Sequence, residues 1–559
     1  MARRRSRSRY SAPSRRHGSV FVASGSSRGA GRRRPARRGV DPRRVTLVFG
    51  VLLVLGAVGA GVFFVQQRRA SNDRRRAAIR EYIAAWQKRD IPGLYALTSV
   101  ASRPSLPGFQ RLWKESDDAA GVQSVQVGSP SALSNNRSTV TVTVKTADFG
   151  TLRGDIELVT DDVNDKGRIV WSPRLRLPGL TGDEVVKRVE GTPPPRGQIF
   201  AADGSDLAGT ASGAGIAGTP PADGQPATGL QRIYDDRLGG HPKESLKFGK
   251  RTIRRVQAVA GRDIHTTLSP GLTQVAENAL GSKLGGVAVI RPKDGAILAV
   301  AGLAVSAPQP PGSTFKIITL SGALQHGIAT PSSSYPVQTA AVLSGVELRN
   351  AGGESCGGAL PTAFADSCNS VFAPLGAKLG AKKLVKTAEA FGFNTTPRVP
   401  AAKESSIFLK DLTDDLATGA AAIGQNKDQA TPLQMAAVGG VIANDGVYVA
   451  PRIVKEDPVK KHRAVSKTVA GEVTSMMIGV VQGGTGTAGA VPGVTVAGKT
   501  GTAELVENST NPQDADAWFV AFAPADDPQI AVAVMLVGAG FGGTSAAPIS
   551  SQVMSAALG

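Results

Sequence analysis

A segment of 21 residues without any charge, Val45 to Val65, limits the architectures open to this chain more than any other part of its sequence. As a helix rising about 1.5 Å per residue it would span roughly 30 Å, the hydrocarbon thickness of a bilayer. A buried core helix is seldom apolar on every side and bounded by arginines at both ends. We therefore expect residues 45–65 to form a single transmembrane helix.

The charge on either side of this segment predicts its orientation. Residues 1–44 hold fifteen arginines and one acid, and residues 66–80 hold six arginines and one acid. Of the formal net charge of +21, this leaves only +2 for residues 81–559. A nucleic-acid-binding domain would carry its charge on a folded face, so we expect no nucleic-acid partner. The larger positive charge before the span places the N-terminus in the cytoplasm.

These features predict a single-pass cell-membrane protein whose catalytic part is extracytoplasmic. Residues 1–44 contain almost no apolar side chains and are expected to be a disordered basic cytoplasmic tail. A cleaved signal peptide is the alternative, because Val58-Gly59-Ala60 resembles a cleavage site. The apolar run continues through Phe63 and Phe64, which favours an uncleaved anchor.

The next part of the chain predicts a small α+β domain over residues 70–187. Apolar residues recur at helical spacing over 74–99, and residues 122–175 alternate as strands do, with turn residues between them. Clustered catalytic residue types are absent from this stretch, so a spacer or docking domain is favoured.

A proline run and a Gly/Ala/Pro-rich stretch predict a linker over residues 188–274. Residues 275–559 then mix helices and strands. They include a hairpin over 287–300, a helix over 313–326 and a terminal strand, Ile530 to Val537. The chain is therefore expected to be a multidomain α/β (α+β) protein.

Two cysteines, Cys356 and Cys368, are compatible with a disulfide in an extracellular location. They are equally compatible with two unpaired thiols, the second beside a functional serine. Five scattered histidines form no ligand-spaced cluster, so neither a metal nor another cofactor is expected.

The first motif that could carry chemistry is Ser313-Thr314-Phe315-Lys316, which follows Pro311-Gly312. A turn followed by an apolar run would place Ser313 in the first turn of a helix, with Lys316 on the same face. A serine hydroxyl needs a base to become a nucleophile, and a lysine serves only when burial or a second cation lowers its pKa. Alone, the pattern is also typical of a helix N-cap with a solvent-directed lysine.

Two further motifs follow in order. Ser367-Cys368-Asn369 supplies a second hydroxyl and an amide, and Lys499-Thr500-Gly501-Thr502 follows a run with strand character. Lys499 is the second cation that Lys316 requires and could attract a substrate carboxylate. Gly501 would let a substrate backbone lie close to the strand.

Together the three motifs resemble the signature of the penicillin-binding protein and serine β-lactamase superfamily. The resemblance implies a transpeptidase domain over 275–559, in which an antiparallel sheet is flanked by helices and joined to an all-helical subdomain. It extends to several further segments: 286–292 with Asp294-Gly295, 422–425 with 431–435, 484–488, Trp518-Phe519 and 546–548.

The N-terminal half resembles class B members of this family. Residues 195–200 are similar to the arginine-glycine element of their linker or pedestal region, although Ala201-Ala202 stands where the family has an Asp-Arg pair. Residues 171–180 resemble the end of the cone-shaped domain of methicillin-resistance-type proteins. That resemblance implies a nuclear-transport-factor-2-like fold for residues 70–187. A glycosyltransferase-like acidic signature is missing between residues 66 and 275, which disfavours a bifunctional class A enzyme.

The resemblance also implies residue roles. Ser313 would attack the penultimate D-alanine carbonyl of a peptidoglycan stem peptide, and Lys316 would accept its proton. The amides of Ser313 and Thr502 would form the oxyanion hole. Ser367 would relay a proton to the leaving D-alanine, and Asn369 would hold the stem-peptide amide.

The third motif would bind the donor, with Lys499, Thr500 and Thr502 on its terminal carboxylate. An amine of a neighbouring stem peptide would resolve the acyl-enzyme, β-lactams would acylate Ser313, and a SEDS-family glycosyltransferase is the implied partner. The alternatives are a D,D-carboxypeptidase or β-lactamase-type hydrolase, and a non-catalytic β-lactam-binding scaffold.

Overall fold

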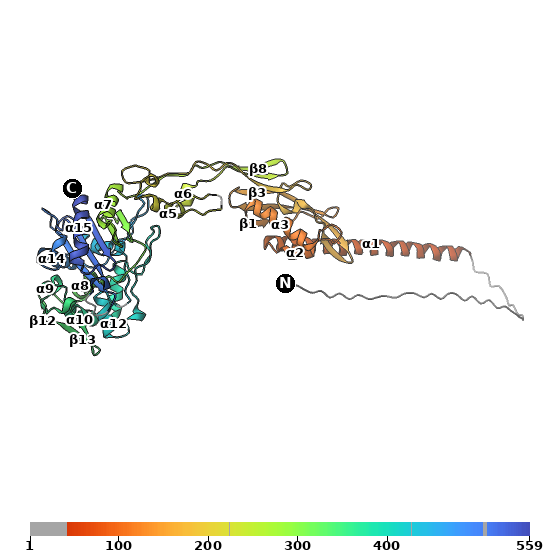
Figure 1. Cartoon of the computed structure of the whole chain (residues 1–559). Coiled ribbons are helices and arrows are strands. Elements are labelled where there is room, and N and C mark those ends of the chain that lie inside the picture. The colour runs from red at the N-terminus through yellow and green to blue at the C-terminus, as the bar shows by residue number, and fades with distance from the viewer. Residues whose placement is uncertain (1–41, 223, 426, 507–510) are drawn as a thin grey trace, which may run out of the picture. The chain divides into compact units, whose positions relative to one another are not determined.

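The structure is a computed structural model of the 559-residue chain, and it describes residues 42–222, 224–425, 427–506 and 511–559 (Figure 1). The predicted tail over residues 1–44 lies almost wholly outside the described residues. The chain folds into two compact units, which we describe separately. The N-terminal unit extends as far as Asp183, and the C-terminal unit contains residues 184–559 with two short upstream segments, 115–122 and 146–150.

The first helix of the N-terminal unit, α1 (Pro42–Gln87), includes the predicted membrane span. Within the described part of the chain, no helix is both long enough and apolar enough to cross a membrane. The side chains of residues 45–57 lie outside that part, and they make up most of the span predicted over 45–65. The helix predicted over 74–99 is interrupted, because Asp90 accepts a hydrogen bond from the Gly93 amide at 2.9 Å and begins a new helix.

The rest of the N-terminal unit packs helices against one sheet, as predicted. Val140, Val142 and Val144 are buried on alternate positions of the second strand, which explains why this segment pairs as half-buried strands. The sheet has the order β1-β2-β3-β4, and an aromatic cluster that includes Trp86, Phe109 and Trp113 fills the core. The elements are α2 (Ile91–Leu97), α3 (Leu106–Ala120), β1 (Val122–Val127), β2 (Arg137–Thr146), β3 (Thr151–Val163) and β4 (Lys166–Ile169).

The segment predicted as a linker over 188–274 has secondary structure of its own. Its three-stranded sheet forms because Leu246 and Phe248 alternate inward and are fully buried. The strands of that sheet are β5 (Val186–Glu190), β7 (Glu244–Phe248) and β8 (Arg251–Val256). The shorter elements are β6 (Ile199–Phe200), β9 (Ile264–His265), η2 (Leu207–Gly209), α4 (Ala214–Ala217), α5 (Gly229–Ile233) and α6 (Asp235–Leu238).

A five-stranded antiparallel sheet, of order β11-β10-β20-β19-β18, forms the centre of the C-terminal unit. Alternate side chains of its strands pack against α7 and α15 on one face and against a second core containing α8 and α13 on the other. The predicted hairpin is confirmed as β10 and β11. The strands of the sheet are β10 (Gly285–Ile290), β11 (Ile297–Gly302), β18 (Ala497–Glu504), β19 (Ala515–Ala523) and β20 (Ile530–Leu536).

The strand predicted as terminal is not the last element. It corresponds to β20, and the chain then forms helix α15 (Gly542–Leu558), whose Ala, Gly and Ser residues give little apolar periodicity. Their small side chains let the helix pack closely on β19 and β20.

The C-terminal unit also contains many helices and several two-stranded sheets. The predicted mixed α/β architecture is therefore confirmed. The helices of the C-terminal unit are α7 (Pro270–Leu280), η3 (Gly312–Phe315), α8 (Lys316–Gln325), η4 (Ala351–Gly353), α9 (Leu360–Ala365), α10 (Asn369–Leu379), α11 (Ala381–Ala390), η5 (Leu409–Asp411), α12 (Asp415–Ala422), α13 (Pro432–Ala443), α14 (Lys467–Gly483), η6 (Thr487–Gly489) and η7 (Pro512–Asp514). Three two-stranded sheets pair β12 (Ser334–Gln338) with β15 (Cys356–Ala359), β13 (Ala340–Leu343) with β14 (Val346–Arg349), and β16 (Val447–Val449) with β17 (Lys461–Arg463).

Candidate active site

Ser313 lies in η3, a tight turn immediately before α8. The predicted helix therefore begins at Lys316, three residues later than expected. Gly312 has φ of +53°, and a Cβ built on it would lie 2.6 Å from the carbonyl oxygen of Thr502. Only glycine allows this left-handed turn to approach β18 so closely. The Gly312 amide also donates to the carbonyl of Gly424 at 2.9 Å, which holds the turn.

The Lys316 side-chain nitrogen lies between the first two predicted motifs. Its Nζ donates to Ser313 Oγ at 2.9 Å, to the carbonyl oxygen of Ser367 at 2.6 Å and to Asn369 Oδ1 at 2.6 Å. The side chain is fully buried, because it reaches back from the first turn of α8 beneath the serine. The structure thus brings residues separated by more than fifty positions onto one nitrogen atom.

The second motif occupies the connection between α9 and α10. Ser367 has φ of +63°, an uncommon conformation for a residue with a side chain, and α10 begins at Asn369. A disulfide joins Cys368, between these two residues, to Cys356 on β15, so the alternative of two free thiols is excluded in this structure. Asn369 was expected to hold substrate, yet its amide also serves the protein: Oδ1 accepts from Lys316, and Nδ2 donates to the Arg349 carbonyl at 2.8 Å.

The third motif lies on β18, at the edge of the central sheet. Lys499 is fully buried and its Nζ donates to Ser367 Oγ at 2.8 Å, while the hydroxyls of Thr500 and Thr485 lie 2.6 Å apart. Gly501 has a role within the protein that the motif did not indicate. A Cβ on it would lie 2.9 Å from the Pro311 carbonyl oxygen and from Trp518 Cβ, so the glycine is required by packing within the protein.

Burial lowers the pKa of both lysines, and repulsion by Lys499 lowers that of Lys316 further. The pKa of Lys316 is well below its ordinary value, first because the amine is removed from water and second because Lys499 lies nearby. Burial also lowers the pKa of Lys499 to about 7, although the carboxylate of Asp366 opposes this shift. The lowered pKa of Lys316 favours the neutral amine that a general base requires.

A cavity of about 520 Å³ opens over Ser313, Ser367, Asn369, Thr500 and Thr502. Lys316, Lys499 and Gly501 do not line it but lie beneath these residues. Several lining residues were not predicted as site residues: Asn350, Glu354, Asp366, Gln425, Thr485, Thr487 and Phe541 to Thr544.

Some of these residues had a signal in the sequence. Gln425, Thr485 and Thr487 belong to segments that carry the family resemblance, whereas Asn350 and Phe541 lie in loops without any motif. The arrangement as a whole offers a serine hydroxyl paired with a buried amine, a second hydroxyl beside another amine, and an edge strand. Such a site can form and resolve a covalent acyl intermediate on Ser313.

Comparison with known proteins agrees with this chemistry. Residues 285–555 match the family model described as the penicillin binding protein transpeptidase domain. The chain is 34% identical over 409 residues to the peptidoglycan D,D-transpeptidase PbpA of Mycolicibacterium smegmatis, which covers 60% of this chain and 80% of the relative. It is 32% identical over 406 residues to PbpA of Mycobacterium tuberculosis, with 59% and 80% covered.

Solved structures give the same result. The D,D-transpeptidase domain of a peptidoglycan glycosyltransferase from Eggerthella lenta is 31% identical, with a TM-score of 0.57 over 66% of this chain and 99% of that chain. The ceftriaxone acyl-enzyme complex of penicillin-binding protein A from M. tuberculosis is 28% identical, with a TM-score of 0.56 and 66% and 99% covered.

Proposed function

The chain belongs to the penicillin-binding protein transpeptidase family, and from this premise we propose that it crosslinks peptidoglycan stem peptides through an acyl-enzyme on Ser313. It is a serine-type D,D-transpeptidase and a target of β-lactams. The observation that carries the assignment of residues is the hydrogen bond of 2.9 Å from the buried Lys316 Nζ to Ser313 Oγ. A buried amine of lowered pKa supplies the base that this hydroxyl lacks by itself.

In the acylation step, Ser313 Oγ attacks the penultimate D-alanine carbonyl while its proton passes to Lys316. The backbone amides of Ser313 and Thr502 stabilise the negative charge that develops on the carbonyl oxygen. When the tetrahedral intermediate collapses, the carbon–nitrogen bond breaks. The leaving D-alanine takes a proton from Ser367 Oγ, which Lys499 resupplies across its 2.8 Å hydrogen bond.

The donor peptide lies along β18, the edge strand, with the hydroxyls of Thr500 and Thr502 facing the cavity. The positive charge beneath them attracts its terminal carboxylate. An amine from a second stem peptide then attacks the ester carbonyl and gives up a proton to Lys499 through Ser367. The Ser313 oxygen leaves, takes its proton back from Lys316, and the crosslink is formed. A β-lactam is a cyclic amide, and Ser313 Oγ attacks its carbonyl as in the first step. The ring opens and Ser313 stays acylated.

The experiment that tests this function is product analysis by mass spectrometry. The purified full chain is given a thioester stem-peptide donor and an amine acceptor, and we expect a crosslinked product. Ser313→Ala and Lys316→Ala should form no acyl-enzyme, while Ser332→Ala, at an exposed serine, should behave as the wild type. Hydrolysed donor alone would indicate a carboxypeptidase or β-lactamase-type hydrolase. Failure to acylate would indicate a non-catalytic scaffold.

We further propose a cell-membrane location with the catalytic part outside, supported by the uncharged segment over 45–65 and the arginine excess before it. We also propose that residues 70–187 form a nuclear-transport-factor-2-like domain. The helices packed on a four-stranded sheet support this, and solving that domain alone would test it. A SEDS-family glycosyltransferase partner stays a prediction of the resemblance, which co-purification from membranes would check.

A further inference from the structure

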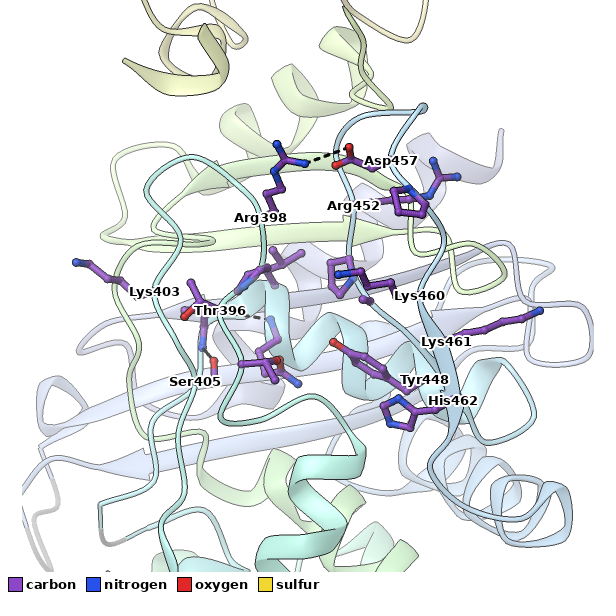
Figure 2. Close-up of a pocket in the computed structure, with 18 residues that line it drawn as sticks. Thr396, Arg398, Lys403, Ser405, Tyr448, Arg452, Asp457, Lys460, Lys461 and His462 are labelled. Carbon is purple, nitrogen blue, oxygen red and sulfur yellow. Dashed lines mark hydrogen bonds and ion pairs between the residues drawn. The ribbon is translucent and has the colours of Figure 1, made fainter. Parts of the chain in front are cut away.

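A second cavity lies in the C-terminal unit and shares no lining residue with the active site (Figure 2). Its volume is about 470 Å³, within the range of pockets that hold small ligands. Its walls are the loop over 395–405, the beginning of α13, and the segment from β16 into β17, residues 448–462. The catalytic mechanism proposed above uses none of these residues.

The side chains that line this cavity carry a large excess of positive charge. Asp457 is the one acidic residue among the described lining residues, against five cations: Arg398, Lys403, Arg452, Lys460 and Lys461. The two arginines are already partnered, Arg398 with Asp457 at 3.5 Å and Arg452 with Asp294 at 2.9 Å. The uncompensated charge therefore belongs to the lysines.

Lys460 is the lysine whose side chain points into the cavity. Figure 2 shows its side chain among the lining residues with the nitrogen toward the centre, whereas Lys403 and Lys461 extend away at either side. Its ammonium group has no ion pair or hydrogen bond to any residue that the structure describes. Its backbone is held, because its carbonyl accepts from the Ala450 amide at 2.9 Å. An unpaired ammonium group in a positively charged recess attracts an anion.

The cavity also has a preformed apolar wall. The ring of Tyr448 is almost fully buried and packs on His462 at 5.0 Å between ring centres. His462 is itself held by the Ala390 carbonyl at 2.8 Å from Nε2. Leu433 and three prolines line the same space: Pro397, Pro451 and Pro458. Such a wall suits a compact apolar group rather than a free inorganic ion.

We propose that this cavity binds a small ligand carrying an oxyanion on a compact apolar body, with the oxyanion on Lys460 and the body against Tyr448. The oxyanion is the carboxylate of a short peptide or the phosphate of a headgroup-like compound. Both sources share the same recognition chemistry, because a lysine ammonium group binds either as a point charge.

The test is calorimetric titration of the full chain after benzylpenicillin has occupied the active site. The mass increase of the acylated protein reports on the proposed function separately, so failure of one does not imply failure of the other. The probes are N-acetyl-(N-acetyl-lysyl)-D-alanyl-D-alanine, its C-terminal amide, and phenyl phosphate. We expect the carboxylate peptide or phenyl phosphate to bind, and comparison of the two identifies the source. The amide should bind about tenfold more weakly than the acid, as expected for one lost charge-assisted hydrogen bond.

Lys460→Gln should weaken binding of the anionic probe about tenfold, and Lys460→Arg should preserve it. Lys467→Gln is the matched control, since Lys467 is an exposed lysine outside the cavity, paired with Asp445 at 2.9 Å. Because Lys460 is exposed, its replacement should leave the melting temperature unchanged. Absence of binding by both anions at millimolar concentration, or equal affinity of the wild type and Lys460→Gln, would overturn the proposal.

Discussion

Ser367 Oγ is the atom that links the two active-site lysines. Lys316 Nζ lies 3.4 Å from it and Lys499 Nζ lies 2.8 Å from it. Two ammonium groups this close, both without access to water, disfavour each other's protonation. Protons can therefore move between the nucleophile and the leaving group through one hydroxyl, with no histidine in the path.

This arrangement makes a prediction for the pH dependence of acylation. The rate constant for acylation by benzylpenicillin should fall on the acid side, where Lys316 becomes protonated, with an apparent pKa far below that of an ordinary lysine. Lys499→Met removes the neighbouring positive charge and so makes protonation of Lys316 easier. The fall of the acylation rate at acidic pH, which we call the acid limb, should then begin at a pH higher by roughly one unit. The measurement is stopped-flow acylation between pH 5 and 9.

Thr500→Val is the control for this prediction. It removes a hydroxyl from the same strand without changing charge, and should lower the rate while leaving the position of the acid limb unchanged. If Lys499→Met lowered the rate without moving the limb, Lys499 would have no electrostatic influence on Lys316.

At the scale of elements, the position of Ser313 depends on the contact between η3 and β18. Gly312 and Gly327 both have positive φ, +53° and +64°, but only Gly312 has a neighbouring backbone where a Cβ would be. Gly327→Ala should cost about 1 kcal/mol from backbone strain and leave acylation unchanged. Gly312→Ala should cost about 1–3 kcal/mol more and slow acylation at least tenfold.

Chemical denaturation and acylation kinetics of the two variants check this comparison. Equal losses of stability, with normal acylation in both, would mean that the turn tolerates displacement from β18. Both replacements introduce the same strain at a positive φ. The difference between their losses of stability therefore measures the cost of the contact between residue 312 and β18.

The pairing of Ser313 with Lys316 could be predicted because their spacing fixes them on one side of a helical turn. The role of Gly501 could not, because what surrounds its backbone depends on how η3 packs against β18. The Asn369 contact with the Arg349 carbonyl was equally hidden, since it joins α10 to the end of β14, twenty residues earlier. Local periodicity contains no information on such contacts.

For the whole molecule, the membrane topology is the prediction to test. The full chain carries one epitope tag before residue 1 and another after residue 559, and protease is added to cells whose wall has been removed. We expect the C-terminal tag to be digested and the N-terminal tag to survive in the membrane fraction. Survival of both tags would place the enzyme inside the cell. Loss of the N-terminal tag from the untreated protein would indicate a cleaved signal peptide.

Composition indicated where the chain changes character, since proline-rich and alternating segments differ visibly, but it did not indicate that residues 188–274 belong to the C-terminal unit. The sheet of β5, β7 and β8 was missed, because its first strand lies more than fifty residues before the other two and pairs across the stretch that looked like linker. The helix α15 was missed because small residues hide its periodicity.

The disulfide between Cys356 and Cys368 has a consequence for where the enzyme can work. It anchors the one residue between Ser367 and Asn369 to a neighbouring strand, so a reduced chain loses that anchor at the active site. In a reducing cytosol the two thiols would stay unpaired. In the extracytoplasmic location proposed above, formation of this bond would be a maturation step that fixes the connection carrying Ser367 and Asn369.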